Sequence, residues 1–340
     1  MTYAIRADDL GKRYGSTRAL DGVSFAARAG EVLGVLGPNG AGKTTAVRIL
    51  ATLTRPDGGV AEVGGFDVVR QAAKVRKVIG LTGQYAAVDE IISGLDNLLV
   101  IGRLLGLPRE TARLRSFELL EQFGLTEAAR RAAGTYSGGM RRKLDLAASL
   151  IGRPQVLFLD EPTTGLDPAA RDGLWDVIRA LVADGTTVLL TTQYLEEADQ
   201  LADRIVVFDH GRVIADGTPF ELKSKIGGQV LEVWPVNERD LGEVATILGE
   251  IARGPATVED RRVSVPVADP DVLRAVVLRL DLADVQVAEL ALRRPSLDEV
   301  FLTLTGHRAA TTSPAGTTSP ASPAGTAAAA REAAAGRAEP

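Results

Sequence analysis

The chain has 340 residues, of which 45% are hydrophobic and 24% charged, and its formal net charge is −5. This length suits one large domain or two smaller ones, with enough apolar material for a sizeable core. The mean hydropathy of +0.07 excludes a chain that is disordered throughout. The acidic balance argues against a dedicated nucleic-acid-binding protein, so we expect no nucleic-acid partner.

Cysteine is absent, which excludes disulfides, thiolate zinc sites and cysteine nucleophiles. The two histidines, His210 and His307, are too few for a metal site built from several histidines. The N-terminal segment MTYAIRADDL lacks the apolar stretch of a signal peptide. No apolar run approaches the roughly 20 residues that a membrane span needs. We therefore expect any role at a membrane to depend on a partner.

Up to about residue 220, short apolar segments alternate with longer amphipathic ones. In most of the short segments nearly every residue is apolar, which is typical of strands that are covered on both faces. This alternation predicts an α/β domain with a largely parallel sheet, closed by a hairpin strand at 212–219. Strands are expected at 31–37, 77–83, 155–160, 186–192 and 204–209, and helices at 42–53, 110–124, 138–152, 168–184 and 194–202.

The pattern changes near residues 225–230, where strands begin to alternate apolar and polar residues, as half-exposed strands do. The order β-α-β-β-α-β followed by a final helix predicts a small α+β domain of the split-βαβ type. Its strands are expected at 231–236, 255–259, 262–267 and 285–290, and its helices at 238–249, 270–281 and 296–305. Beyond it, Ala, Thr, Ser, Pro and Gly dominate, which predicts a disordered tail. The expected domains are therefore 1–224, 229–306 and the tail 307–340.

A phosphate-binding loop is predicted at residues 37–44, where GPNGAGKT follows a strand and opens a helix. Glycines let backbone N–H groups approach phosphates closely, and the following helix points its positive end at the same anion. Lys43 would reach the β- and γ-phosphates of a nucleotide, and the Thr44 hydroxyl would be a ligand of Mg²⁺. The expected nucleotide-binding residues of this loop are Gly37, Pro38, Asn39, Gly40, Ala41, Gly42, Lys43, Thr44 and Thr45.

Two carboxylates end the apolar strand VLFLDE, at the edge where a parallel sheet opens onto its ligand. Asp160 is placed to hold Mg²⁺, and Glu161 to polarise water against the γ-phosphate. A second anion site is predicted at YSGGM, where Ser137, Gly138 and Gly139 begin a helix. Taken alone, DE would favour a solvated strand end and SGG an ordinary helix cap, so the functional interpretation depends on their occurring together with the phosphate loop.

The order of the motifs GPNGAGKTT, YSGGM, VLFLDEPTTGLDP and TTQYLEEAD resembles the nucleotide-binding subunit of ABC transporters over about residues 3–220. The resemblance implies a P-loop NTPase fold with a parallel core sheet, an antiparallel subdomain and a helical subdomain. It also implies that two subunits bind ATP between them, head to tail. The motif TTQYLEEADQLADRI, the added C-terminal domain and the ending SLDEVFLTLTG resemble the daunorubicin/doxorubicin-resistance type of exporter ATPase.

This resemblance implies roles for three further residues. Tyr14 would stack on adenine, Gln84 would contact Mg²⁺ and water and couple to a membrane partner, and Asp167 would lie across the dimer interface. The partners implied are a separate membrane permease and a second copy of the chain. The expected location is the cytoplasmic side of the cell membrane, as a peripheral subunit that hydrolyses ATP to drive drug efflux.

The chain departs from the family where a switch histidine is expected, because TTQ places Gln193 there. Glutamine cannot become cationic, but it can still donate a hydrogen bond to the γ-phosphate. The departure puts fast turnover in doubt more than nucleotide binding.

Other functions fit the same loop less well. Export of a lipid or polysaccharide remains open, as does a non-transport ABC ATPase of translation or DNA repair. The latter class usually carries duplicated cassettes or coiled-coil insertions, and neither is visible here. A GTPase would need an N-K-x-D motif, and no asparagine of this chain is followed by lysine.

Overall fold

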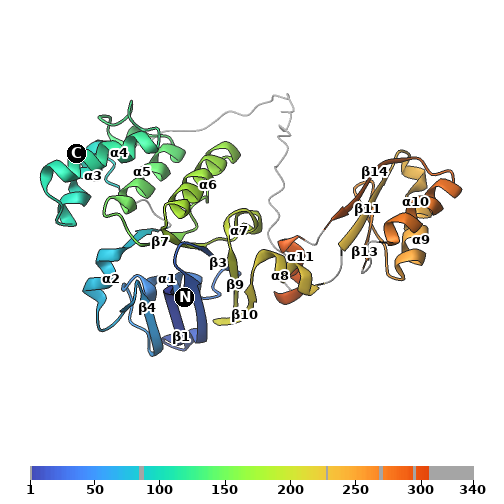
Figure 1. Ribbon diagram of the computed structural model, residues 1–340, viewed down its shortest axis with the longest axis horizontal. Helices are drawn as coiled ribbons and strands as arrows, with labels where there is room; N and C mark the ends of the chain where they lie inside the picture. Colours follow the sequence, from blue (N-terminus) through green and yellow to red (C-terminus); the bar gives the residue numbers. More distant parts are fainter. Residues whose placement is uncertain (1, 84–87, 227–228, 268–270, 294–295, 306–340) are drawn as a thin grey trace, which may run out of the picture.

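The computed structural model describes residues 2–83, 88–226, 229–267, 271–293 and 296–305 (Figure 1). Gln84 and the expected tail 307–340 lie outside these residues. Within the described part of the chain, no helix is long and apolar enough to cross a membrane.

The central sheet has six strands, of which five are parallel and the sixth, β10, pairs antiparallel with β9. Every residue of β3, β7 and β8 is buried, which is why these segments are apolar nearly throughout. The predicted parallel sheet and its closing hairpin are confirmed. The strand order is β10 (Arg212–Gly217), β9 (Arg204–Asp209), β3 (Val32–Leu36), β8 (Thr187–Thr191), β7 (Val156–Asp160) and β6 (Ile79–Thr82).

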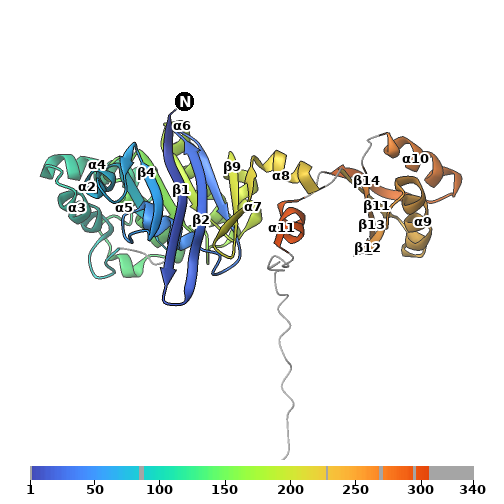
Figure 2. The ribbon, with the colours of Figure 1, turned by 90° about the horizontal axis from the view of Figure 1, so that it is seen from below.

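A second sheet is antiparallel and includes the long hairpin formed by β1 and β2 (Figure 2). One face of this hairpin shares a core with helix α1 (Lys43–Leu50) and with one face of the central sheet. This packing fixes the helix that follows the phosphate loop between the two sheets. The strand order is β2 (Thr17–Arg28), β1 (Tyr3–Tyr14), β4 (Gly58–Val63) and β5 (Phe66–Asp67).

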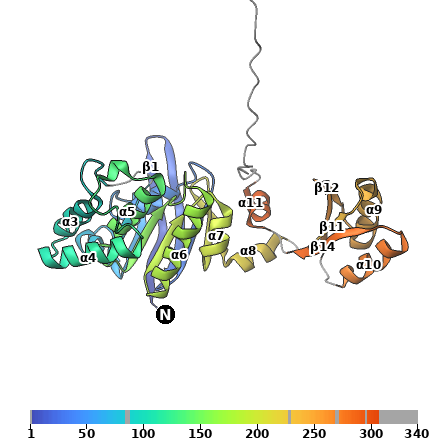
Figure 3. The same cartoon turned by 90° about the horizontal axis from the view of Figure 1, so that it is seen from above.

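The other face of the central sheet is covered by helices that share one large core (Figure 3). Helices α3, α4 and α5 pack against one another and form a helical part to one side of the sheet (Figure 1). The helices of this face are α3 (Gly94–Leu104), α4 (Arg109–Gln122), α5 (Gly138–Leu150), α6 (Pro168–Ala183) and α7 (Leu195–Leu201), with a 3₁₀ turn at Ala133–Thr135. Helix α2 (Ala72–Val78) instead contacts β5 and β6 and buries Val75 in the core shared with the hairpin.

The C-terminal unit is an antiparallel sheet covered on one face by two helices, with a core of its own. The elements follow the predicted order β-α-β-β-α-β, and the first strand lies between the third and the fourth, as in a split βαβ fold. The strands in sheet order are β12 (Thr257–Glu259), β13 (Arg262–Val267), β11 (Gln229–Pro235) and β14 (Val287–Arg293), and the helices are a 3₁₀ turn (Glu238–Asp240), α9 (Leu241–Ala252) and α10 (Val272–Leu282).

The last helix, α11 (Leu297–Thr305), does not pack where the sequence analysis placed it. We expected it within a domain ending at residue 306, but its apolar residues Leu297, Val300 and Phe301 belong to the large core of the nucleotide-binding part. Its contacts are with α7 and α8 (Pro219–Ile226). The apolar face of α11 must be covered, and it packs on the large core rather than on the C-terminal unit that precedes it in the sequence.

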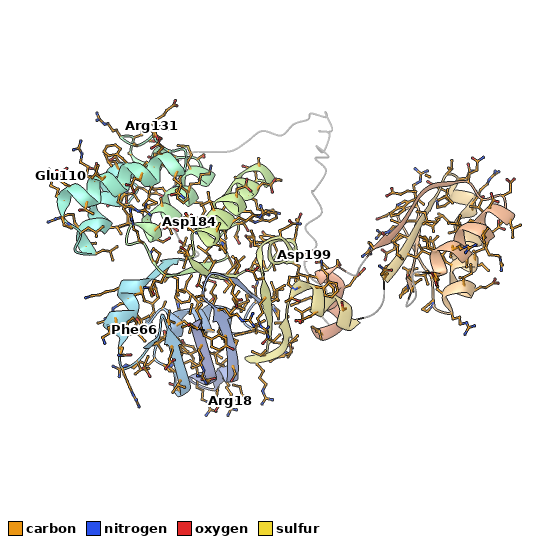
Figure 4. All side chains as sticks on the ribbon, viewed as in Figure 1. Arg18, Phe66, Glu110, Arg131, Asp184 and Asp199 are labelled. Atoms are coloured by element: carbon orange, nitrogen blue, oxygen red, sulfur yellow. The ribbon has the colours of Figure 1, made fainter. Side chains whose placement is uncertain are left out.

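Helices α7 and α8 are themselves tied together where α11 contacts them. Lys223 of α8 donates a hydrogen bond of 2.7 Å to Asp199 of α7, which is labelled in Figure 4. At the start of α11, Ser296 and Glu299 satisfy each other's backbone N–H groups, which makes a capping box. The chain thus returns to the nucleotide-binding part after the C-terminal unit.

Candidate active site

The candidate site lies at the carboxyl edge of the central sheet. Val35 of β3 and Asp160 of β7 are both in register with Thr191 of β8, the strand between them. The three strands therefore end in one row, and the segments that follow them start side by side. The structure thus brings together the phosphate loop, the two carboxylates and Gln193, as the sequence pattern predicts.

Two glycines of the phosphate loop have no room for any side chain. Gly37 and Gly42 have φ angles of 154° and 108°, which L-residues rarely adopt. A Cβ atom on Gly37 would lie 2.4 Å from the carbonyl oxygen of Phe208, and one on Gly42 would lie 2.5 Å from that of Ala19. Close packing against β9 and β2 therefore requires glycine at both positions, independently of any ligand.

Lys43 is buried, with 5% of its surface exposed. Its ammonium group donates hydrogen bonds to the carbonyl oxygens of Gly37 at 2.7 Å and Pro38 at 3.1 Å. Burial lowers the pKa of Lys43, and the nearby carboxylates of Glu161 and Asp160 oppose this shift. The lysine thus places its charge between the loop and the acidic pair, where an anionic ligand would be held.

Asp160 is buried and accepts a hydrogen bond of 2.5 Å from the hydroxyl of Thr191. The hydroxyl of Thr44, in the first turn of α1, lies 3.5 Å from the same carboxylate oxygen. A carboxylate and a hydroxyl are hard oxygen donors, and Mg²⁺ in proteins usually takes one or two of these beside phosphate oxygens and water. The residues present therefore fit the expected magnesium ion.

Glu161 has a positive φ angle of 52°, which is uncommon for a residue with a side chain. Its N–H donates to the carbonyl oxygen of Thr191 at 3.0 Å and to the Thr191 hydroxyl at 3.2 Å. The side chain is half-buried and accepts a long hydrogen bond of 3.4 Å from Thr164. The carboxylate is thus carried on a chain held in an unusual conformation.

The signature segment forms an exposed helix start. The Ser137 side chain accepts a hydrogen bond of 3.2 Å from the N–H of Met140 and caps α5. Asp167 caps α6 in the same way, through a bond of 2.9 Å from the N–H of Ala170. A Cβ on Gly139 would lie 3.4 Å from that of Ala170, so the two capped helix starts are neighbours. Ser137, Gly138 and Asp167 are exposed.

The other two expected residues, Tyr14 and Gln193, are exposed. Tyr14 ends β1 with 48% of its surface exposed, and the Lys12 ammonium lies 5.5 Å from the centre of its ring. It stands on the hairpin whose second strand borders the phosphate loop at Ala19. Gln193 follows β8 and is exposed.

Sequence reasoning did not find Arg142, one turn into α5. Its side chain is 11% exposed and donates to three backbone carbonyl oxygens, of Pro162 at 2.7 Å, Gly83 at 2.8 Å and Glu161 at 3.0 Å. Burial lowers the pKa of Arg142, while Asp145, Glu197 and Asp160 oppose the shift. No pattern in MRRK distinguishes Arg142 from Arg141, so only the structure could reveal it.

Glu197 was also missed. It is fully buried beneath the segment that carries Gln193, and its Oε1 accepts a hydrogen bond of 3.2 Å from the indole N–H of Trp175 on α6. Burial raises the pKa of Glu197, while the Thr192, Trp175 and Thr163 side chains and the charge of Arg171 oppose the shift. The adjacent Glu196 is exposed, so the pair EE gave no signal of a buried carboxyl.

The raised pKa of Glu197 predicts a pH-dependent stability. A raised pKa means that the folded chain holds this proton more tightly than the unfolded chain, so the wild type loses stability as the pH rises above about 4.5, the usual pKa of glutamate. Glutamine cannot ionise, yet it can accept the bond from Trp175. We expect Glu197→Gln to raise the melting temperature by a few degrees at pH 8 and by much less at pH 5, measured by circular dichroism.

Glu196→Gln is the matched control, and we expect its melting temperature to follow the wild type at both pH values. A Glu197→Gln variant that is less stable than the wild type at pH 8 would mean that the buried carboxylate is ionised and paired.

Comparison with known proteins agrees with this geometry. Residues 20–164 match the family model for ABC transporters, and residues 217–305 match that for the C-terminal domain of DrrA1-3-like ATP-binding proteins. A daunorubicin resistance ATP-binding protein, DrrA2 of Streptomyces coeruleorubidus, is 57% identical over 313 residues, which are 91% of this chain and 97% of the relative. The Nod factor export ATP-binding protein I of Ralstonia nicotianae is 40% identical over 307 residues, 90% of this chain and 94% of the relative.

Solved structures match the nucleotide-binding part. CbiO1 of Clostridium perfringens, part of the ABC transporter complex cbiONQ, superposes with a TM-score of 0.61 and 26% identity, covering 66% of this chain and 92% of that one. The P-loop NTPase fold expected from the motifs is thus confirmed. The chain belongs to the ATP-binding proteins of the ABC transporter family, in the branch that carries a DrrA-like C-terminal domain.

Proposed function

We propose that this chain hydrolyses ATP to drive the efflux of a drug or antibiotic through a separate membrane permease. The observation that carries the proposal is the convergence of Lys43, Asp160 and Glu161 at the carboxyl edge of the sheet, in a chain 57% identical to a daunorubicin resistance ATP-binding protein. ATPase subunits of ABC exporters work with membrane permeases. The chain would accordingly act at the cytoplasmic face of the cell membrane, as a peripheral subunit.

Each residue of the site would have a separate role toward one bound ATP. Residues Gly37 to Thr45 would surround the β- and γ-phosphates, which the Lys43 ammonium and the backbone N–H groups of every loop residue except Pro38 would bind. Tyr14 would stack on adenine. Thr44, Asp160 and Gln84 would hold Mg²⁺, which supplies charge stabilisation for phosphoryl transfer. Glu161 would accept the proton of the attacking water.

A second copy of the chain would complete each site. The Ser137 cap leaves the first N–H groups of α5 pointing at solvent beside the Asp167 cap of α6. Such a helix start favours an anion. The proposal is that Ser137, Gly138 and Gly139 contact the ATP held by the partner copy, with Asp167 at the interface.

Replacement of Glu161 by Gln tests the catalytic roles and the dimer together. The amide keeps the shape of the side chain but cannot accept the proton, so we expect kcat to fall by about 10²- to 10⁴-fold. ATP should then accumulate in a closed dimer at micromolar protein, detected by size-exclusion chromatography with ATP and Mg²⁺. Adding EDTA, or Lys43→Ala in the same chain, should return the protein to monomer. Strictly monomeric Glu161→Gln, with and without the permease, would contradict the head-to-tail arrangement.

A second test concerns Gln193. As a neutral hydrogen-bond donor, glutamine stabilises the charge that develops on the γ-phosphate less than a cationic histidine would. We expect slow basal hydrolysis, with kcat raised up to about 5-fold in Gln193→His and lowered about 10-fold in Gln193→Ala. The measurement is kcat across pH 6–9 with the wild type alongside. Hydrolysis by Gln193→Ala at the wild-type rate would remove Gln193 from the site.

Two other functions remain as alternatives. Export of a lipid or polysaccharide is favoured by the 40% identity to a Nod factor export protein, and it uses the same residues. A non-transport ABC ATPase is the other.

Expression with and without its candidate permease separates the non-transport alternative from export. We expect the chain to sediment with membranes only when the permease is present, because the contact requires that partner. Recovery in the soluble fraction in both cases would favour the non-transport alternative.

A further inference from the structure

Arg142 joins three segments that sequence places far apart. Its side chain leaves α5, the helix that begins with the signature residues, and meets the chain just after β7 and the residue just after β6. The contacts are the carbonyl oxygens of Pro162 and Glu161 on one side, and that of Gly83 on the other. A weaker contact of 3.5 Å reaches the carbonyl oxygen of Asp160.

The shape of the guanidinium explains why arginine fits here. It presents five N–H donors in a fixed plane, and this plane reaches several carbonyl oxygens at once. Asp145, one turn further along α5, lies 3.5 Å from the same group and balances its charge. A lysine would keep the charge but offer it as a single point, so it could not bond all of these oxygens with the same geometry.

Two of the Arg142 hydrogen bonds hold the backbone of Glu161 and Pro162, which sets the direction of the Glu161 side chain. Glu161 has a φ angle of 52°, a conformation that costs free energy and persists only where its surroundings hold it. Thr191 holds its N–H, and Arg142 holds its carbonyl oxygen and that of the next residue. Both peptide groups around the carboxylate are thus fixed, and one of the two anchors comes from the signature helix.

We propose that Arg142 is a positioning residue that holds the Glu161 backbone in its catalytic direction and links it to the signature helix α5. The inference rests on the proposed role of Glu161 as the base. A shift of α5 on contact with a partner's nucleotide is then transmitted to this chain's own carboxylate. Arg142 acts through the backbone of Glu161 and Pro162, to which its guanidinium donates.

The test compares Arg142→Lys, Arg142→Met and the control Arg115→Met. Arg115 is a partly buried arginine of α4 that pairs with Glu118 and donates to the carbonyl oxygen of Leu150, at the end of α5 opposite to the signature residues. The measurements are kcat and KM for ATP, and the melting temperature. We expect kcat to fall about 10-fold in Arg142→Lys and up to about 100-fold in Arg142→Met, as a small misplacement of a catalytic group does, with KM within about 2-fold. The control should keep the wild-type kcat.

Combination with Glu161→Gln separates positioning from a general loss of structure. If Arg142 acts through Glu161, the double variant Arg142→Lys, Glu161→Gln should be no slower than Glu161→Gln alone. Additive losses, or a wild-type kcat in Arg142→Lys, would overturn the inference while leaving the proposed function intact. A wild-type kcat in Glu161→Gln would instead overturn the proposed base, and this inference with it.

Discussion

The candidate site depends on the burial of one ammonium group. Lys43 is buried, so its charge must be balanced by the carbonyl oxygens of the loop and by the carboxylates of Asp160 and Glu161. Those partners can approach only because Gly37 and Gly42 allow the loop to pack against β9 and β2 without a side chain. The antiparallel hairpin, the parallel sheet and helix α1 therefore all pack around the buried Lys43 ammonium, at the place where a phosphate would bind.

Much of this arrangement could be predicted from the sequence, because the reactive residues sit on segments with clear patterns. Apolar strands that end in GPNGAGKT or DE must place those residues at the carboxyl edge of a parallel sheet, and the structure places Lys43, Asp160 and Glu161 there. The split-βαβ order of the C-terminal unit could also be predicted, because its strands alternate apolar and polar residues. The hairpin strands β1 and β2 were not assigned individually, because RADDLGKRY contains too many polar residues to read as a buried strand.

What the sequence could not provide is the choice between neighbours and the identity of a packing partner. Arg141 and Arg142 look alike as letters, but α5 turns one toward Glu90 and the other toward the chain of Glu161. Glu196 and Glu197 differ in the same way, since one faces solvent and the other lies under Trp175. The apolar face of α11 shows that something must cover it, but not that α7 and α8 do so. Each of these facts depends on three-dimensional contacts between distant segments.

The return of α11 gives the C-terminal unit two attachments to the nucleotide-binding part. The chain leaves through α8, whose last residue is Ile226, and comes back into α11 at Leu297, and both helices pack on the same core. In this respect the unit is an insertion rather than an appendage. Two attachments restrict the motion of a unit relative to its neighbour more than a single tether does. After a protease cut between α8 and β11, the unit would stay joined to the nucleotide-binding part through the packing of α11 on α7 and α8. A second cut, before α11, would then release it.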